Sequence, residues 1–61
     1  IKPDPNIYKL LMKTYGLTPQ KTVFIDDKSV NVEAANALGI HGIHYKNASK
    51  LRNDLRKLKL L

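Results

Sequence analysis

Residues 21–27 read Lys-Thr-Val-Phe-Ile-Asp-Asp, and the order of elements in this 61-residue chain follows from them. Four β-prone residues, Thr22 to Ile25, follow one another without the polar alternation of a strand that faces water on one side. Such a continuous run predicts a strand that is buried on both faces, as in a parallel sheet. Asp26 and Asp27 come directly after it, at the strand end where open α/β sheets bind their ligands.

Helical spacing of apolar residues flanks this strand on both sides. Before it, the pattern predicts a helix that is capped by Asp4, begins at Pro5 and ends at Gly16. After it, a second helix is expected from Val30 to Leu38, closed by Gly39. The residues expected to face inward from this second helix are Val30, Ala34, Ala35 and Leu38.

The remainder of the chain predicts one more strand and one more helix. The short apolar stretch from Ile40 to Tyr45 is expected to form the second strand. Residues 49–58 carry Leu51, Leu55 and Leu58 at the i, i+4, i+7 spacing of an amphipathic helix. The predicted order is therefore α-β-α-β-α, with two parallel strands joined by a helical crossover. Two strands leave two unpaired edges, so we expect the C-terminal half of a doubly wound α/β domain.

Composition narrows the classes of protein to which this chain could belong. The chain has no cysteine, which excludes a disulfide framework and a thiolate metal site. With no signal pattern and no long apolar run, we expect a soluble, cytoplasmic protein that has no membrane partner. The net charge is +6, but the cations are dispersed and lack interleaved aromatic residues, so a nucleic-acid partner is not favoured.

The acid pair is the first candidate site. Two adjacent carboxylates repel each other unless a cation or a donor lies between them, and Mg²⁺ commonly takes one or two carboxylates together with waters and a substrate phosphate. Alternatively, one aspartate caps the next helix while the other faces solvent. Lys2 is the second candidate, because Pro3 and Pro5 stiffen the segment that carries it. Its ammonium group could contact a phosphoryl group, or it could be an ordinary surface lysine.

Taken together, these residues resemble the C-terminal part of the haloacid dehalogenase (HAD) superfamily. The resemblance is carried by Lys2-Pro3-x-Pro5, then Asp26-Asp27, then Ser29-x-Asn31-x-Glu33-Ala34-Ala35-x-x-x-Gly39-Ile40. It implies a Rossmann-like, three-layer HAD-type fold in which Lys2 is the catalytic lysine of the third motif. It also implies that Asp27 is the more direct Mg²⁺ ligand of the fourth motif and Asp26 a second acid or outer-shell group. Many relatives carry a further acid at the position of Asn31, an uncharged oxygen donor, which makes Asn31 a secondary candidate for the metal site. The alternative is that Asn31 caps or hydrogen-bonds the loop.

Other parts of the family pattern are absent from the sequence. It holds no DxDx[TV] motif with the aspartate nucleophile, no recognisable second-motif Ser or Thr, and no cap. Residues 1–61 are therefore expected to be a C-terminal fragment of a HAD-like core domain, whose partner is the missing N-terminal half. The resemblance implies that the parent protein is a Mg²⁺-dependent phosphatase of a small phosphorylated metabolite, which works through an aspartyl phosphate. The isolated chain is expected to be inactive.

Several alternatives stay open at this point. One is a non-catalytic basic module that binds nucleic acid or a protein, and another is the dehalogenase branch of the same superfamily, which works without Mg²⁺. A response-regulator receiver also uses an acid pair and a Lys-Pro, but in the reverse order. His41 and His44 lie three positions apart on a predicted strand and so face opposite sides. We therefore expect ordinary surface histidines there and no shared metal ion.

Overall fold

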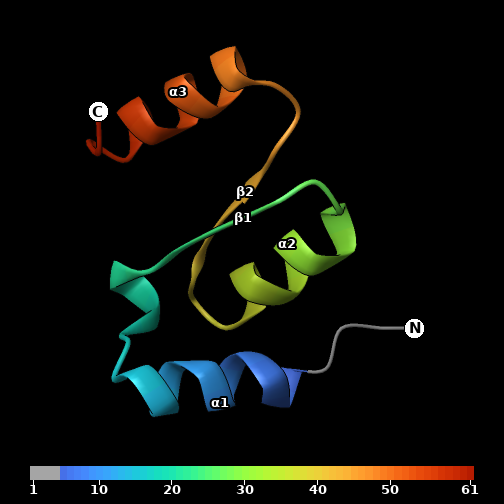
Figure 1. Cartoon of the computed structure of the whole chain (residues 1–61), viewed down its shortest axis with the longest axis vertical. Coiled ribbons are helices and arrows are strands. Elements are labelled where there is room, and N and C mark those ends of the chain that lie inside the picture. Colours follow the sequence, from blue (N-terminus) through green and yellow to red (C-terminus); the bar gives the residue numbers. More distant parts are fainter. Residues whose placement is uncertain (1–4) are drawn as a thin grey trace.

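The computed structural model describes residues 5–61, and the predicted order of elements is confirmed within them (Figure 1). The elements are α1 (Pro5–Tyr15), a 3-10 helix η1 (Pro19–Lys21), β1 (Val23–Asp26), α2 (Ser29–Ala37), β2 (His41–His44) and α3 (Ala48–Lys57). Lys2 and the expected cap Asp4 lie outside the described residues. None of the helices in residues 5–61 is both long and apolar enough to cross a membrane.

The two strands form a parallel pair that α2 connects as a crossover helix. The register runs from Val23 opposite His41 to Asp26 opposite His44. Helix α2 packs on both strands, and α1 packs on α2. Figure 1 shows α1 and α2 on one side of the strand pair and α3 on the other. This layered arrangement confirms the α/β class and the two parallel strands, and it places the ends of both strands at one rim of the fold.

The core lies between the strand pair and the first two helices. Its buried side chains are those of Tyr8, Val32, Ala35, Ile40 and Ile43, of which Ala35 has no exposed surface. The ring of Tyr8 meets that of Phe24 edge-on, with centroids 5.4 Å apart. This aromatic contact ties α1 to β1.

One predicted core position in α2 is wrong. Val30 was expected to face inward, but its side chain is 55% exposed. Val32 is buried instead, three residues before Ala35 and on the same face of the helix. Because a residue two positions away lies almost on the opposite face of an α-helix, burial of Val32 turns Val30 to solvent.

The prediction that β1 is buried on both faces is also wrong. Val23 and Phe24 are half-buried, and Ile25 is 45% exposed. Side chains alternate along a strand, so Ile25 lies on the face opposite Phe24, away from α1 and α2. Within residues 5–61 the side chain of Leu58 reaches this face beside Val23, and Ile25 stays uncovered.

Local signals fix the end of α1 and the start of α3. Gly16 has a φ of +63°, and the N–H of Leu17 donates to the carbonyl of Met12 at 2.8 Å, which is the pattern of a glycine-terminated helix. At the start of α3, the side chain of Asn47 accepts a hydrogen bond from the N–H of Lys50 at 2.8 Å. The sequence predicted the first of these signals and did not identify the second.

Candidate functional site

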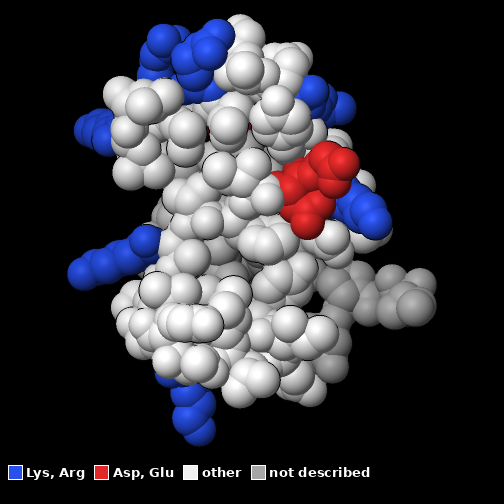
Figure 2. All heavy atoms as spheres, in the orientation of Figure 1, with Lys and Arg blue, Asp and Glu red and all other residues white. Residues whose placement is uncertain are grey.

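The acid pair lies at the carboxyl end of β1. Asp26 is the last residue of the strand and Asp27 begins the loop that leads to α2. The end of β2 lies beside them, because Asp26 is paired with His44 in the sheet. Figure 2 shows an acidic patch over the loop between β1 and α2, with a basic side chain directly beside it and other Lys and Arg side chains scattered over this face. The pair is thus a local concentration of negative charge on a basic chain.

The carboxylate of Asp26 is held by donors from its own loop and from α2. The N–H of Lys28 donates to Oδ1 at 2.7 Å, and the side-chain amide of Asn31 donates to Oδ2 at 3.1 Å. The hydrogen bond from Lys28, followed by the one from Asn31, lowers the pKa of Asp26 below its ordinary value. Asp26 is therefore ionised at neutral pH, and its carboxylate closes the loop after β1.

Asn31 links this loop to the core. While its side chain holds Asp26, its backbone carbonyl accepts a hydrogen bond of 3.4 Å from the hydroxyl of Tyr8 in α1. The alternative that Asn31 hydrogen-bonds the loop is thus confirmed. A contact of Asn31 with a metal ion stays a prediction.

Asp27 is the exposed member of the pair. Its backbone carbonyl lies 2.9 Å from Nε2 of His44. Its side chain contacts the carboxylate of Asp26. The loop is therefore held through Asp26 and through the backbone, and the Asp27 carboxylate is exposed beside Asp26.

This donor set fits part of a Mg²⁺ site. In residues 5–61, no group of three or more His, Cys, Asp or Glu side chains is arranged to hold a metal ion. Mg²⁺ binds readily through one or two carboxylates when waters and a phosphate complete its six oxygen ligands, which is what an exposed Asp27 beside a fixed Asp26 offers. The position of Lys2 relative to the pair stays a prediction, because Lys2 lies outside the described residues.

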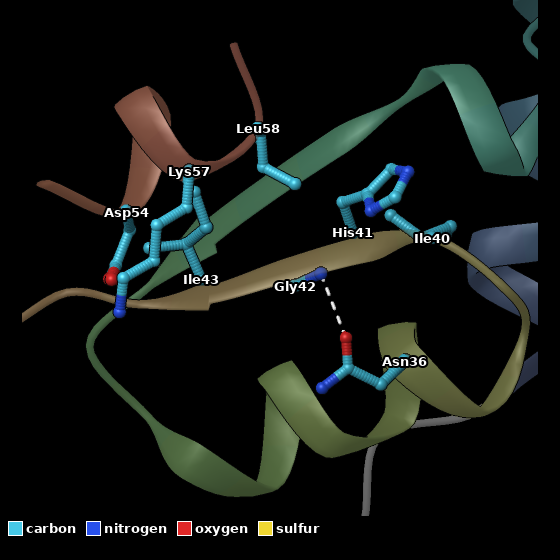
Figure 3. Close-up of a pocket in the computed structure, with 8 residues that line it drawn as sticks. All are labelled: Asn36, Ile40, His41, Gly42, Ile43, Asp54, Lys57 and Leu58. Carbon is cyan, nitrogen blue, oxygen red and sulfur yellow. Dashed lines mark hydrogen bonds between the residues drawn. The ribbon is translucent and has the colours of Figure 1, made fainter. Parts of the chain in front are cut away.

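A separate open hollow of about 270 Å³ lies beside β2, between the strand and the end of α3 (Figure 3). Its lining residues are Asn36, Ile40, His41, Gly42, Ile43, Asp54, Lys57 and Leu58. The side chain of Asn36 points to the strand and accepts a hydrogen bond from the N–H of Gly42 at 2.8 Å. Neither aspartate of the acid pair lines this hollow, so it is not part of the candidate metal site.

The two histidines of β2 contact backbone carbonyls at opposite ends of β1. Nε2 of His41 lies 2.8 Å from the carbonyl of Gln20, before the strand, and Nε2 of His44 lies 2.9 Å from that of Asp27, after it. The sequence predicted that they would not share a metal ion but did not predict these bonds. The partners are 21 and 17 residues away in sequence, so no local pattern could have identified them.

Comparisons with known proteins give a family match and several relatives. The family model described as HAD-hydrolase-like matches residues 1–60. The chain is 39% identical over 57 residues to the chloroplast flavin mononucleotide hydrolase 1 of Arabidopsis thaliana, covering 93% of this chain and 23% of that protein. It is 37% identical over 57 residues to the sesquiterpene phosphatase astK of Aspergillus oryzae, covering 93% and 29%. It is 42% identical over 43 residues to the phosphorylated carbohydrates phosphatase of Thermotoga maritima, covering 70% and 20%. The chain thus spans less than a third of the length of each of these relatives.

Proposed function

This chain belongs to the HAD-like hydrolase family, and we propose that it forms the C-terminal part of a Mg²⁺-dependent phosphatase that acts on a small phosphorylated metabolite. The observation that carries the proposal is the exposed carboxylate of Asp27 at the carboxyl end of β1, beside Asp26, which the chain's own donors hold. Two of the relatives are named as phosphatases, and the names of all three refer to a phosphorylated compound or to its hydrolysis. These names support phosphate-ester hydrolysis by the longer protein.

Each polar residue of the site has a role in this proposal. Asp27 would bind Mg²⁺ directly, and Asp26 would keep the loop closed and add negative charge behind the ion. Asn31 fixes Asp26 through its side-chain amide. When bound, Mg²⁺ would supply positive charge to the phosphoryl oxygens of the substrate. Lys2 would place a second positive charge on the same phosphoryl group.

The residue that attacks phosphorus is not in this sequence. No DxDx[TV] motif occurs in residues 1–61, so the aspartyl phosphate would form on a carboxylate of the longer protein. The chain then contributes charge stabilisation and part of the metal site, and we expect it to be inactive by itself.

The rest of the sheet would pair with β1. The carbonyls of Thr22 and Asp26 accept hydrogen bonds from β2, so by alternation the N–H and C=O groups of Val23 and Ile25 point to the other edge of β1. A strand from the missing N-terminal half would pair with these groups.

At the edge of β2 that faces away from β1, by contrast, side chains already bond the backbone groups. The side chain of Asn36 accepts from the N–H of Gly42, and Nζ of Lys50 donates to the carbonyl of His44 at 3.2 Å. Side chains that cap backbone groups are one way in which proteins protect a sheet edge from further pairing. The contrast between the two edges favours β1 as the strand that continues the sheet.

The test is a phosphatase assay of the longer protein that contains this chain, on a panel of small phosphate esters, with Mg²⁺ and with a chelator. Asp27→Asn should lower the rate on the order of a hundredfold, whereas Asp26→Asn should lower it about tenfold. Glu33→Gln is the matched control, because it makes the same change of carboxylate to amide at an exposed position of α2. Hydrolysis that survives both the chelator and Asp27→Asn would overturn the proposal.

A further inference from the structure

The imidazole of His44 reaches across from β2 to the loop that carries the candidate metal ligand. Its Nε2 lies 2.9 Å from the backbone carbonyl of Asp27. A carbonyl oxygen only accepts hydrogen bonds, so Nε2 must carry the proton and donate it. Both the neutral Nε2–H tautomer and the imidazolium ion can make this bond, so the contact does not depend on the charge of the ring.

This bond completes the attachment of the loop on the side of β2. The carbonyl of Asp26 accepts from the N–H of Tyr45 at 2.8 Å, and the carbonyl of Asp27 accepts from His44. On the side of α2, the loop is held through the carboxylate of Asp26 by Lys28 and Asn31. Two successive peptide carbonyls of the acid pair are thus fixed from the neighbouring strand, which restricts the direction in which the Asp27 side chain leaves the backbone.

The residue that orients the loop is itself fixed. His44 is the last residue of β2, paired in register with Asp26, and is half-buried. Its own carbonyl accepts from Nζ of Lys50, which also forms an ion pair with Asp54. Groups that hold a ligand are effective when their own positions are fixed by packing and hydrogen bonds, and His44 meets this condition.

We propose that His44 is a positioning residue, which orients the Asp27 carboxylate for the cation by fixing the Asp27 peptide through its Nε2–H. This rests on the proposed function in one respect, namely that Asp27 binds the metal ion. His44 touches neither the cation nor the substrate in this role.

The test measures metal binding directly, without turnover. The longer protein is titrated with Mn²⁺, a probe whose free and bound forms are distinguished by electron paramagnetic resonance. His44→Leu, which fills the space but has no donor, should weaken Mn²⁺ binding about threefold to tenfold, the effect of losing one hydrogen bond. His44→Gln keeps an N–H donor and should recover most of the affinity.

His41→Leu is the matched control. It removes the same kind of bond, from Nε2 to the carbonyl of Gln20, at the end of β1 that is remote from Asp27. It should lower stability to thermal unfolding and leave Mn²⁺ affinity unchanged. Equal losses of affinity in His44→Leu and His41→Leu would mean that both bonds only stabilise the fold, and this would overturn the inference.

The outcomes separate the inference from the proposed function. If Asp27→Asn abolishes Mn²⁺ binding and His44→Leu does not weaken it, the positioning role is wrong and the metal site stands. If the unmutated longer protein and its Asp27→Asn variant bind Mn²⁺ equally, the proposed metal site is wrong, and the positioning role of His44 is wrong with it. Should His44→Leu not fold, ¹⁵N spectra of the parent protein decide, since a neutral His44 with its proton on Nδ1 contradicts the inference.

Discussion

The side-chain amide of Asn31 donates to Oδ2 of Asp26 at 3.1 Å, so the first turn of α2 is bonded to the last residue of β1. The Asp26 carboxylate therefore connects the end of β1 to α2, whereas the neighbouring carboxylate of Asp27 is exposed. Two adjacent acids of identical chemistry thus have different environments. The difference arises from their hydrogen bonds: the Asp26 carboxylate accepts from Lys28 and Asn31, whereas Asp27 lies in the loop and is exposed.

Replacing Asn31 by alanine should raise the pKa of Asp26. The variant loses one of the two main hydrogen bonds that favour the carboxylate and keeps the larger contribution, from the N–H of Lys28. The pKa should therefore stay below the ordinary value of 3.8. Carbon-detected NMR of the aspartate carboxyl groups measures this. Asn53→Ala removes an amide that bonds Arg56 in α3, and it should leave the Asp26 titration unchanged.

The same carboxylate should make stability depend on pH in the acid range. The pKa of Asp26 in the folded state lies below the unfolded value, so its contribution is present above the unfolded pKa and is lost as the pH falls through the folded pKa. The Asp26→Asn variant should therefore be less stable than the unmutated protein at neutral pH. The difference in their free energies of unfolding should shrink at about pH 3. Urea unfolding of both proteins at the two pH values measures this, and a difference that grows on acidification would contradict it.

Gly42 is required by the close approach of α2 to β2. A Cβ atom at this position would lie 2.7 Å from Oδ1 of Asn36 and 2.9 Å from the backbone carbonyl oxygen of Val32. Gly42→Ala should therefore destabilise the fold by about 1–3 kcal/mol, measured by urea unfolding.

Two comparisons give the cause of that loss. Gly16→Ala meets no atom within 4 Å and is strained only through its φ of +63°, so it should cost about 1 kcal/mol. Asn36→Ala removes one of the three atoms that would clash, the other two being Cγ1 and the backbone oxygen of Val32, so Gly42→Ala should be less harmful in that background. Equal effects in both backgrounds would place the strain at Val32.

The sequence was a good guide wherever a feature depends on residues close together along the chain. The end of α1 at Gly16 and the strand that ends in Asp26 follow from local patterns. The errors concern burial. Val30 and Val32 are equally apolar, and only the docking of α2 on the strands decides which of them is covered. Ile25 belongs to a continuous apolar run, yet it is exposed because residues 5–61 supply no cover for it.

The sequence predicted the two acids of the candidate site but not the hydrogen bonds that support them. Asp26 and Asp27 stand out as a pair after an apolar strand, and parallel-sheet topology says where such residues lie. The bond from His44 to the Asp27 carbonyl joins residues that only the register of the sheet brings together. Which of the two acids is held and which is exposed also required the register and the start of α2.

The open edge of β1 predicts how the 61-residue chain should behave alone. The outward backbone groups of Val23 and Ile25 lie next to an exposed Ile25 side chain, and an exposed apolar strand edge promotes pairing between chains. The chain should therefore associate as its concentration rises, more strongly when salt screens its net charge of +6. Sedimentation velocity over a range of concentrations measures this.

Ile25→Lys should keep the chain monomeric, because a charged side chain on an edge strand opposes pairing. Val30→Lys is the matched control: it exchanges another exposed aliphatic residue, 55% exposed and in α2, for the same charge. The Val30→Lys variant should associate nearly as strongly as the unmutated 61-residue chain, after allowance for the added charge. In the longer protein, Ile25→Lys should reduce stability to urea more than Val30→Lys does, because the missing strand would have to pair beside the lysine. Equal behaviour of the two variants in both experiments would show that the sheet does not continue at this edge.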